Sequence, residues 1–116
     1  MAQSEPPENT AASPPLPRRA VLYTYAARTA SHARQEEALR LYAGTHGFTI
    51  ADVYSDTGER SARERLVTDA QADMCDAVLI TERNCLARDA EDYDRIRDVL
   101  TEVSVRLIVL SDEEQL

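Results

Sequence analysis

The 116-residue sequence predicts an α/β fold, with a mainly parallel four-stranded sheet and helices on both faces. Two observations support this prediction. Segments with the composition of strands alternate along the chain with segments that have helical periodicity. One of the strand segments, DAVLI at residues 76–80, is a continuous apolar run, which is typical of a central strand in a parallel sheet. The length suits one small domain.

The domain is expected to span residues 19–112. Residues 1–18 contain all five prolines together with small and polar residues, and too few apolar side chains to offset the entropy of ordering. They are therefore predicted to form a disordered tail. Residues 113–116 are expected to form a short acidic tail.

The first half of the domain is predicted as strand, helix, strand and loop. Residues 20–26 form a strand candidate with β-branched and aromatic content. Residues 31–47 follow as a helix, with an apolar stripe on one side, Ser31 as its N-cap and glycines near its end. Residues 48–54 are expected as the second strand, and residues 55–62 as a polar loop.

The second half repeats the alternation. Residues 63–73 are predicted as a short helix, 76–80 as the third strand and 81–88 as a loop or irregular turn. The clearest helix is 89–103, because Asp89 can cap it, acidic residues fill its first turn and apolar residues line one face. Residues 105–110 form the last strand candidate, and a polar segment follows.

The charge balance limits the classes of function. There are 21 acidic and 13 basic residues, for a formal net charge of −8, and every basic residue is Arg. This balance opposes strong nonspecific binding of nucleic acid, which depends on neutralising phosphates. Neither a membrane-spanning segment nor a secretory signal is expected, and the chain is predicted to be cytoplasmic.

The sequence predicts neither a cofactor nor a metal site. Cys75 and Cys85 lie ten residues apart without a CxxC motif or a nearby His, and a disulfide is not expected in a cytoplasmic chain. Cys75 is expected to face the core at the entrance of a strand. Cys85 is interpreted as an inert thiol in a loop. No glycine-rich phosphate loop is present, so the sequence does not favour a nucleotide-binding domain.

The order of several motifs suggests a family. A strand containing Tyr23 is followed by RQEEALRLYAGTHG, then VYSDTG, RERL, DAVLI and LARD before the amphipathic helix. Over about residues 19–112 this order resembles the catalytic domain of the resolvase/invertase family of serine recombinases. In parallel sheets of this kind, ligands bind at the carboxyl ends of the strands, and three of the four strand ends hold the residues considered next.

The resemblance implies a reaction. In that family a Ser hydroxyl attacks a DNA phosphodiester to give a 5′-phosphoserine link, and Arg side chains stabilise the charge on the phosphoryl oxygens. Phosphoryl transfer depends mainly on such positioning and electrostatic stabilisation. The family function implied is site-specific DNA recombination by strand exchange.

The family's first strand ends in Tyr-x-Arg-x-Ser, and the present chain departs from that pattern. Tyr23 matches the Tyr, but Tyr25 stands at the Arg and Ala27 at the nucleophilic Ser. A methyl group cannot attack phosphorus, and a phenol does not replace a fixed positive charge. Whether the chain is an enzyme is therefore uncertain, and catalysis is expected to be lost.

The later motifs are partly kept. Asp56 matches the loop after the second strand, and Arg63 keeps the Arg of the next helix. The family's Asp-Arg-Leu-x-Arg after the third strand reads Asn84-Cys85-Leu86-Ala87-Arg88, so that only Arg88 keeps a charged group of that motif. Arg63 and Arg88 are interpreted either as residual phosphate-binding groups or as surface or ion-pairing arginines near Asp56, with the second interpretation favoured.

The sequence also offers a fallback nucleophile, Ser31. An insertion in this chain relative to the family motif would bring Arg28 and Ser31, which follow Ala27 closely, into the roles of the Arg and the nucleophilic Ser, with Thr29 as a neighbouring hydroxyl. Ser31 lies only four residues before Gln35, which anchors the helix match, and the helix cap is the favoured role for Ser31.

Three interpretations follow. The first is an inactive serine recombinase domain, which binds DNA weakly if at all, and which lacks the long helix and DNA-binding module that family members carry after this domain. The second is a non-enzymatic interaction module, a homo-oligomer or a partner of an active recombinase. The third, a receiver-like signalling domain, is disfavoured because the first strand ends without an acidic cluster and the chain has no Lys.

Overall fold

The computed structural model describes residues 18–113. The predicted disorder of residues 1–18 and the acidic tail at 113–116 thus fall almost entirely outside the described residues. At the boundaries, Arg18 belongs to the first strand and Glu113 to the last helical turn. Among residues 18–113, no helix has the length and apolar character needed to cross a membrane.

Four strands form one sheet. They are β1 (Arg18–Tyr25), β2 (Phe48–Asp56), β3 (Ala77–Ile80) and β4 (Arg106–Val109). All pairs are parallel and the order is β2-β1-β3-β4, so the predicted parallel four-stranded sheet is confirmed. The shift in register between Ala20 and Val21 is a local irregularity in the β1–β2 ladder.

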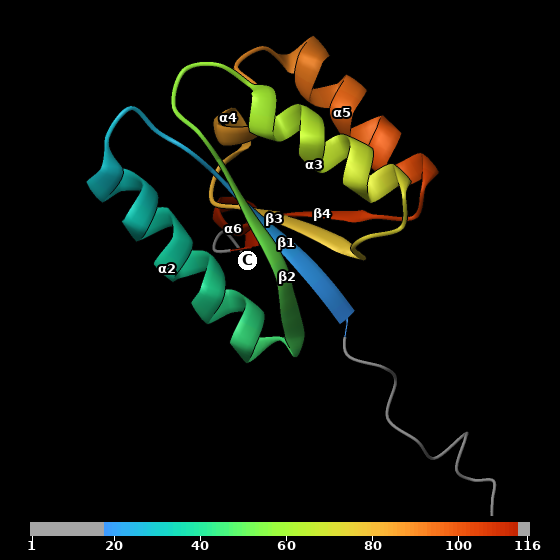
Figure 1. Ribbon diagram of the computed structural model, residues 1–116, viewed down its shortest axis with the longest axis horizontal. Coiled ribbons are helices and arrows are strands. Elements are labelled where there is room, and N and C mark those ends of the chain that lie inside the picture. Colours follow the sequence, from blue (N-terminus) through green and yellow to red (C-terminus); the bar gives the residue numbers. More distant parts are fainter. Residues whose placement is uncertain (1–17, 114–116) are drawn as a thin grey trace, which may run out of the picture.

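Helices cover both faces of the sheet, as predicted (Figure 1). Helix α2 (Thr29–Thr45) lies on one face, and α3 (Ser61–Gln71) and α5 (Ala90–Glu102) lie on the other. Two short turns, α4 (Arg83–Leu86) and α6 (Leu110–Glu113), follow β3 and β4. The α4 turn lies within residues 81–88, which were predicted as a loop or irregular turn, whereas α6 corrects the prediction of a polar tail after residue 110.

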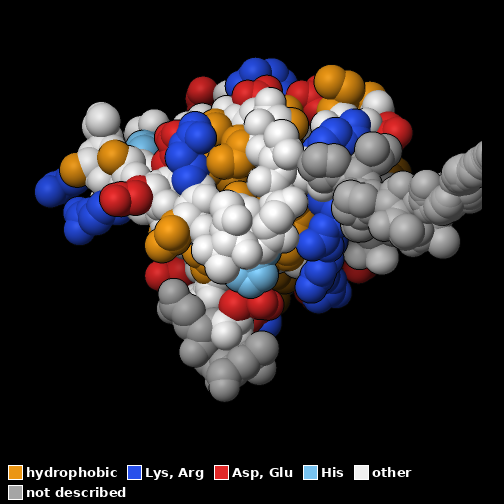
Figure 2. Space-filling view, turned by 90° about the horizontal axis from the view of Figure 1, so that it is seen from below, with side chains coloured by type: hydrophobic (Ala, Val, Ile, Leu, Met, Phe, Trp, Pro, Cys, Tyr) orange, Lys and Arg blue, Asp and Glu red, His pale blue; other side chains and the backbone are white. Residues whose placement is uncertain are grey.

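The core consists of two apolar layers, one on each side of the sheet. Alternate residues of β1 supply both, since Val21 and Tyr23 face α3 and α5 while Leu22 faces α2. Cys75 is 2% exposed within the larger layer, which confirms its predicted core position. On the face of the molecule shown in Figure 2, acidic and basic side chains are interspersed and hydrophobic ones occupy only small areas.

The ends of the helices follow local sequence in two cases. The Asp89 side chain accepts a hydrogen bond from the Asp92 backbone N–H at 2.8 Å, which confirms the predicted cap of α5. After α2, Gly47 has a φ of 77°, a left-handed conformation that glycine adopts without steric cost.

Candidate functional site

The carboxyl ends of the parallel strands lie at one edge of the sheet, here called the carboxyl edge. A pocket of about 270 Å³ opens there, between the end of β1 and the α4 turn. Its lining residues are Tyr25, Ala26, Asn84, Cys85 and Arg88. Four of these five are positions that the sequence singled out, so the fold brings the two ends of the predicted site together.

The end of β1 is held by two side chains of α2. The Gln35 amide donates to the Tyr25 carbonyl and accepts from the Tyr25 N–H, both at 3.0 Å. Three residues earlier on the same helix, His32 Nε2 lies 2.8 Å from the Ala26 carbonyl oxygen. Ala27 follows these anchored residues directly and is exposed. The position expected for the nucleophile is therefore well placed, but it carries only a methyl group.

With a neutral imidazole, the two contacts of the His32 ring allow only one arrangement of donors and acceptors. A carbonyl can only accept, so Nε2 carries the proton and Nδ1 accepts from the Thr24 hydroxyl at 2.8 Å. Thr24 in turn accepts from the Ser55 hydroxyl at 2.7 Å. Because Thr24 is fully buried, this chain satisfies a polar group that would otherwise destabilise the core.

Asp56 is occupied by structural contacts. Its carboxylate accepts from the backbone N–H groups of Ala62 and Arg63, at 2.9 and 3.0 Å, and from the Tyr23 hydroxyl at 2.7 Å. The first two bonds satisfy free N–H groups in the first turn of α3, as an N-cap does. Burial is the main cause of a raised pKa at Tyr23, and its hydrogen bond to Asp56 adds to the effect, so the phenol stays protonated as the donor.

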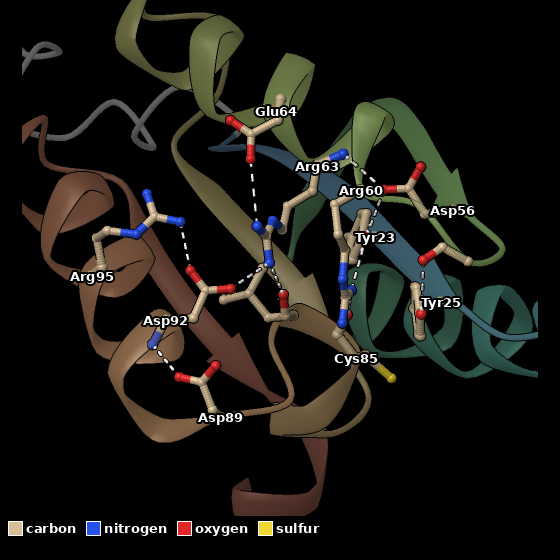
Figure 3. Close-up of polar contacts among 12 residues, drawn as sticks. Tyr23, Tyr25, Asp56, Arg60, Arg63, Glu64, Cys85, Asp89, Asp92 and Arg95 are labelled. Carbon is tan, nitrogen blue, oxygen red and sulfur yellow. Dashed lines mark hydrogen bonds and ion pairs between the residues drawn. The ribbon is translucent and has the colours of Figure 1, made fainter.

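Arg63 is also committed to the fold. Its side chain is buried rather than at the surface, and of the two alternatives, surface or ion-pairing, it is ion-paired. Its Nη1 donates to the Leu86 carbonyl at 2.9 Å and to Asp92 at 3.0 Å. Its charged partners are Asp92 and Glu64, and only its backbone contacts Asp56. Arg63 thus joins α3 to α4 and α5 (Figure 3).

Arg60 was not identified from the sequence. Its guanidinium carbon lies 3.7 Å from the centre of the Tyr25 ring, and its Nη1 donates to the Cys85 carbonyl at 2.6 Å and to the Tyr23 hydroxyl at 3.2 Å. These residues surround Arg60 in Figure 3. The only sequence property that could have suggested Arg60 is its place in a loop that follows a parallel strand at the carboxyl edge.

Tyr25 and Cys85, the positions that lack the expected arginines, both contact the Arg60 guanidinium. Tyr25 packs against it and its hydroxyl donates to the Gly58 carbonyl at 3.3 Å. Cys85 is 7% exposed, and its thiol lies 3.4 Å from the Thr81 hydroxyl and 3.7 Å from the Gln35 amide oxygen. The chain therefore places one guanidinium between two positions where the resemblance implies two.

The remaining predicted residues differ in their surroundings. Asn84 and Arg88 are exposed, and among residues 18–113 the Arg88 guanidinium has neither a hydrogen-bond partner nor an ion pair. Ser31 lies inside the first turn of α2, because the helix begins at Thr29 and its N-cap is Arg28. No side chain caps this helix, so the prediction that Ser31 is the cap is wrong.

Comparisons with known proteins agree with this architecture. The family model described as "Resolvase, N terminal domain" matches residues 24–116. None of the curated proteins compared with the chain matches it.

Several solved structures are similar. The N-terminal catalytic domain of TP901-1 integrase has 25% sequence identity and a TM-score of 0.75, over 82% of this chain and 79% of that one. A resolvase family site-specific recombinase from Streptococcus pneumoniae has 22% identity and a TM-score of 0.76, over 82% and 73% of the two chains. The C-terminal catalytic domain of ISC1926 TnpA, an IS607-like serine recombinase, has 24% identity and a TM-score of 0.73, over 79% and 67%. The family model covers most of the length of this chain. The chain therefore belongs to the resolvase family of serine recombinases and corresponds to the family's N-terminal catalytic domain. The function of that family is site-specific DNA recombination.

Proposed function

We propose that this domain keeps the fold of a serine recombinase catalytic domain but does not form the covalent link to DNA. The observation that supports this most directly is Ala27, at the end of a β1 strand that Gln35 and His32 hold in place. Without a nucleophilic side chain at this position, the phosphoseryl intermediate cannot form there.

The surrounding groups support the same proposal. In an active site of this family, cations and a carboxylate face the reacting phosphate. Here the Asp56 carboxylate accepts hydrogen bonds from three buried donors, and the Arg63 guanidinium is engaged by Leu86 and Asp92. Asp56 and Arg63, two of the three charged residues that keep the family's identity, are used to fix α3, which leaves these two unavailable for transition-state stabilisation.

The fallback hydroxyl is poorly placed. Ser31 belongs to the first turn of α2, and the pocket at the carboxyl edge is lined by other residues. Thr29 begins the helix and is exposed. Neither has a positioned base or cation in contact with its hydroxyl among the described residues, whereas nucleophilic catalysis requires such activation.

The experiment is a search for a covalent protein–DNA adduct. The full chain is incubated with nicked suicide duplexes of randomised sequence and, as a probe that needs no recognition site, with bis(4-nitrophenyl) phosphate. Intact-mass spectrometry then detects any phosphoryl adduct, with an active serine recombinase as the positive control. No adduct is expected. An adduct mapped to Ser31 or Thr29 would overturn the proposal.

A substitution series sharpens this test. Ala27→Ser alone is expected to give no adduct, because Tyr25 and Cys85 still lack the cations that stabilise the transition state. The triple variant Ala27→Ser, Tyr25→Arg, Cys85→Arg restores all three groups and is the matched comparison. Cleavage by the single variant would show that the surrounding groups are competent after all.

The second candidate is a protein-interaction module with the same fold, a homo-oligomer or a partner of an active recombinase. The net charge of −8 favours it, because this charge opposes binding to DNA by the chain alone. Free thiols at Cys75 and Cys85 are typical of a reducing compartment, which supports a cytoplasmic role. Size-exclusion chromatography with light scattering, with and without an active recombinase, tests for a complex.

A further inference from the structure

Strand β4 forms one of the two edges of the sheet, and its outer side has no partner strand among residues 18–113. The Arg106 N–H donates to the Asp76 carbonyl at 3.0 Å, so the backbone of Arg106 faces β3. Because backbone groups alternate in direction along a strand, the N–H groups of Leu107 and Val109 point away from β3. The outer edge of β4 therefore offers hydrogen-bonding groups to a further strand.

A groove of about 560 Å³ lies beside this strand. Its lining includes Leu107 and Val109 of β4, and Tyr93, Arg97 and Thr101 of α5. Since these three residues of α5 are spaced four apart, they form one stripe on the surface of the helix. An extended segment that pairs with β4 would place its side chains on one face against this stripe and would fill the groove.

The opposite edge of the sheet is protected against such pairing. There the β1–β2 ladder shifts register, with Ala51 as an extra residue of β2. The Asp52 carboxylate also accepts a hydrogen bond from the Val53 N–H at 2.7 Å. Bulges and charged side chains of this kind oppose edge-to-edge pairing. The β3–β4 ladder has no shift in register, so β4 is the edge that remains open.

The charges at the two ends of β4 indicate what pairs with it. Arg106 at the start of the strand and Glu113 in the α6 turn after it are both exposed, and neither has an ion pair among residues 18–113. Within that part of the chain, the Glu113 carboxylate accepts only from the neutral Tyr42 hydroxyl, at 3.4 Å. When two copies of β4 run antiparallel, the basic start of each copy lies beside the acidic end of the other.

This arrangement is self-complementary, because a twofold axis generates two contacts between Arg106 of one copy and Glu113 of the other. The net charge of −8 opposes it only weakly. At an ionic strength of about 0.15 M, charges on the surface that are more than about 8 Å apart are largely screened.

We propose that β4 is the interface of a homodimer, in which two copies of the chain pair antiparallel through this strand about a twofold axis near Ile108. Leu107 of one copy then lies opposite Val109 of the other, and the two residues exchange backbone hydrogen bonds. The two sheets become one continuous sheet, and each β4 edge is covered. The proposal names the self-interface of the interaction module that is the second candidate under the proposed function, and it rests on that candidate.

The test is self-association of the full chain, measured by analytical ultracentrifugation over a range of concentrations in about 0.15 M salt. The wild type is expected to form dimers. Arg106→Glu and Glu113→Arg each put two like-charge contacts into a homodimer, so each variant is expected to dimerise about tenfold more weakly or worse. An equimolar mixture of the two variants restores both opposite-charge contacts in the heterodimer and is expected to recover dimerisation.

Arg34→Glu is the matched control, because it changes the net charge by the same amount as Arg106→Glu, and Arg34 is exposed on α2 outside the groove. Recovery on mixing cannot arise from a contact within one copy, because mixing leaves such a contact unchanged. Amide hydrogen exchange gives a second readout. The N–H groups of Leu107 and Val109 should exchange more slowly as the protein concentration rises.

A chain that stays monomeric at about 1 mM would overturn the proposal and would leave the groove to a different polypeptide. It would also be overturned if Arg34→Glu weakened dimerisation as much as Arg106→Glu, or if mixing the two variants gave no recovery. These outcomes are independent of the search for a covalent adduct. A dimer without an adduct supports both proposals, whereas a dimer that forms an adduct overturns only the proposed loss of covalent chemistry.

Discussion

Substitution of Asp56 is expected to destabilise the fold rather than to affect a reaction. Asp56→Ala leaves two backbone N–H groups of α3 and the Tyr23 hydroxyl without their acceptor. Asp56 itself is only 4% exposed, so water does not readily replace its carboxylate. A hydrogen bond to a charged group contributes about 1.5–3 kcal/mol, and the three bonds to one carboxylate are not additive. The expected loss is about 3–5 kcal/mol, out of a total stability of about 5–15 kcal/mol for a small domain.

The measurement is the free energy of unfolding from urea titrations followed by circular dichroism. Asp56→Asn keeps one acceptor oxygen and should lose less stability than Asp56→Ala. Asp112→Ala is the matched control, because Asp112 pairs with the exposed Arg83 at 2.9 Å and an exposed ion pair contributes about 0–1 kcal/mol. A loss below about 1 kcal/mol for Asp56→Ala would refute the structural role of this carboxylate.

Three other predictions concern the thiols, one carboxylate and one turn. Iodoacetamide at pH 8 should label Cys85 before Cys75 in the native protein, because burial raises the pKa of Cys75 to about 11 whereas Cys85 lines a pocket. Mass spectrometry of the peptides measures the labelling, and an equally fast reaction of Cys75 would contradict this prediction. Hydrogen bonds from Arg19 lower the pKa of the Asp76 carboxyl, so this pair stabilises the fold at pH values above the ordinary carboxyl pKa, and the contribution is lost as pH falls through the lowered pKa. Urea titrations from pH 6 to 2.5 should therefore show a smaller acid-induced loss for Asp76→Asn than for the wild type, and equal losses would argue against the pair. Gly47→Ala should cost about 1 kcal/mol, since φ is 77° there, and an unchanged midpoint of thermal unfolding would show that the turn relaxes.

The sheet and its carboxyl edge were predictable because they depend on patterns that persist over several residues. The apolar run at 76–80 became the central strand β3, and the alternation of strands with helices required parallel pairing. Asp89 was predictable as a cap, because an acidic first turn followed it. The same alternation predicted that ligands would bind at the carboxyl ends of the strands, and Tyr25, Cys85 and Arg88 line one pocket at that edge.

Features that depend on side-chain contacts between loops were not predictable. The α4 turn has only four residues, too few to show a helical repeat. Helix α2 begins two residues before Ser31, since His32 and Gln35 bind the end of β1 and hold the first turn against it. The position of Arg60 depends on the path of the loop before α3, which Asp56 fixes through contacts that no sequence period reveals.

The hydrogen bonds of Asp56 also affect how a sequence is assigned to this family. The loop that contains Asp56 carries part of the resemblance to recombinases, yet its carboxylate holds together the start of α3 and the Tyr23 phenol. These contacts stabilise the fold whether or not a chain of this family cuts DNA. Sequence similarity in this loop therefore indicates membership of the family and its fold. The ability of a chain to break a phosphodiester has to be judged at the positions equivalent to Ala27 and Tyr25.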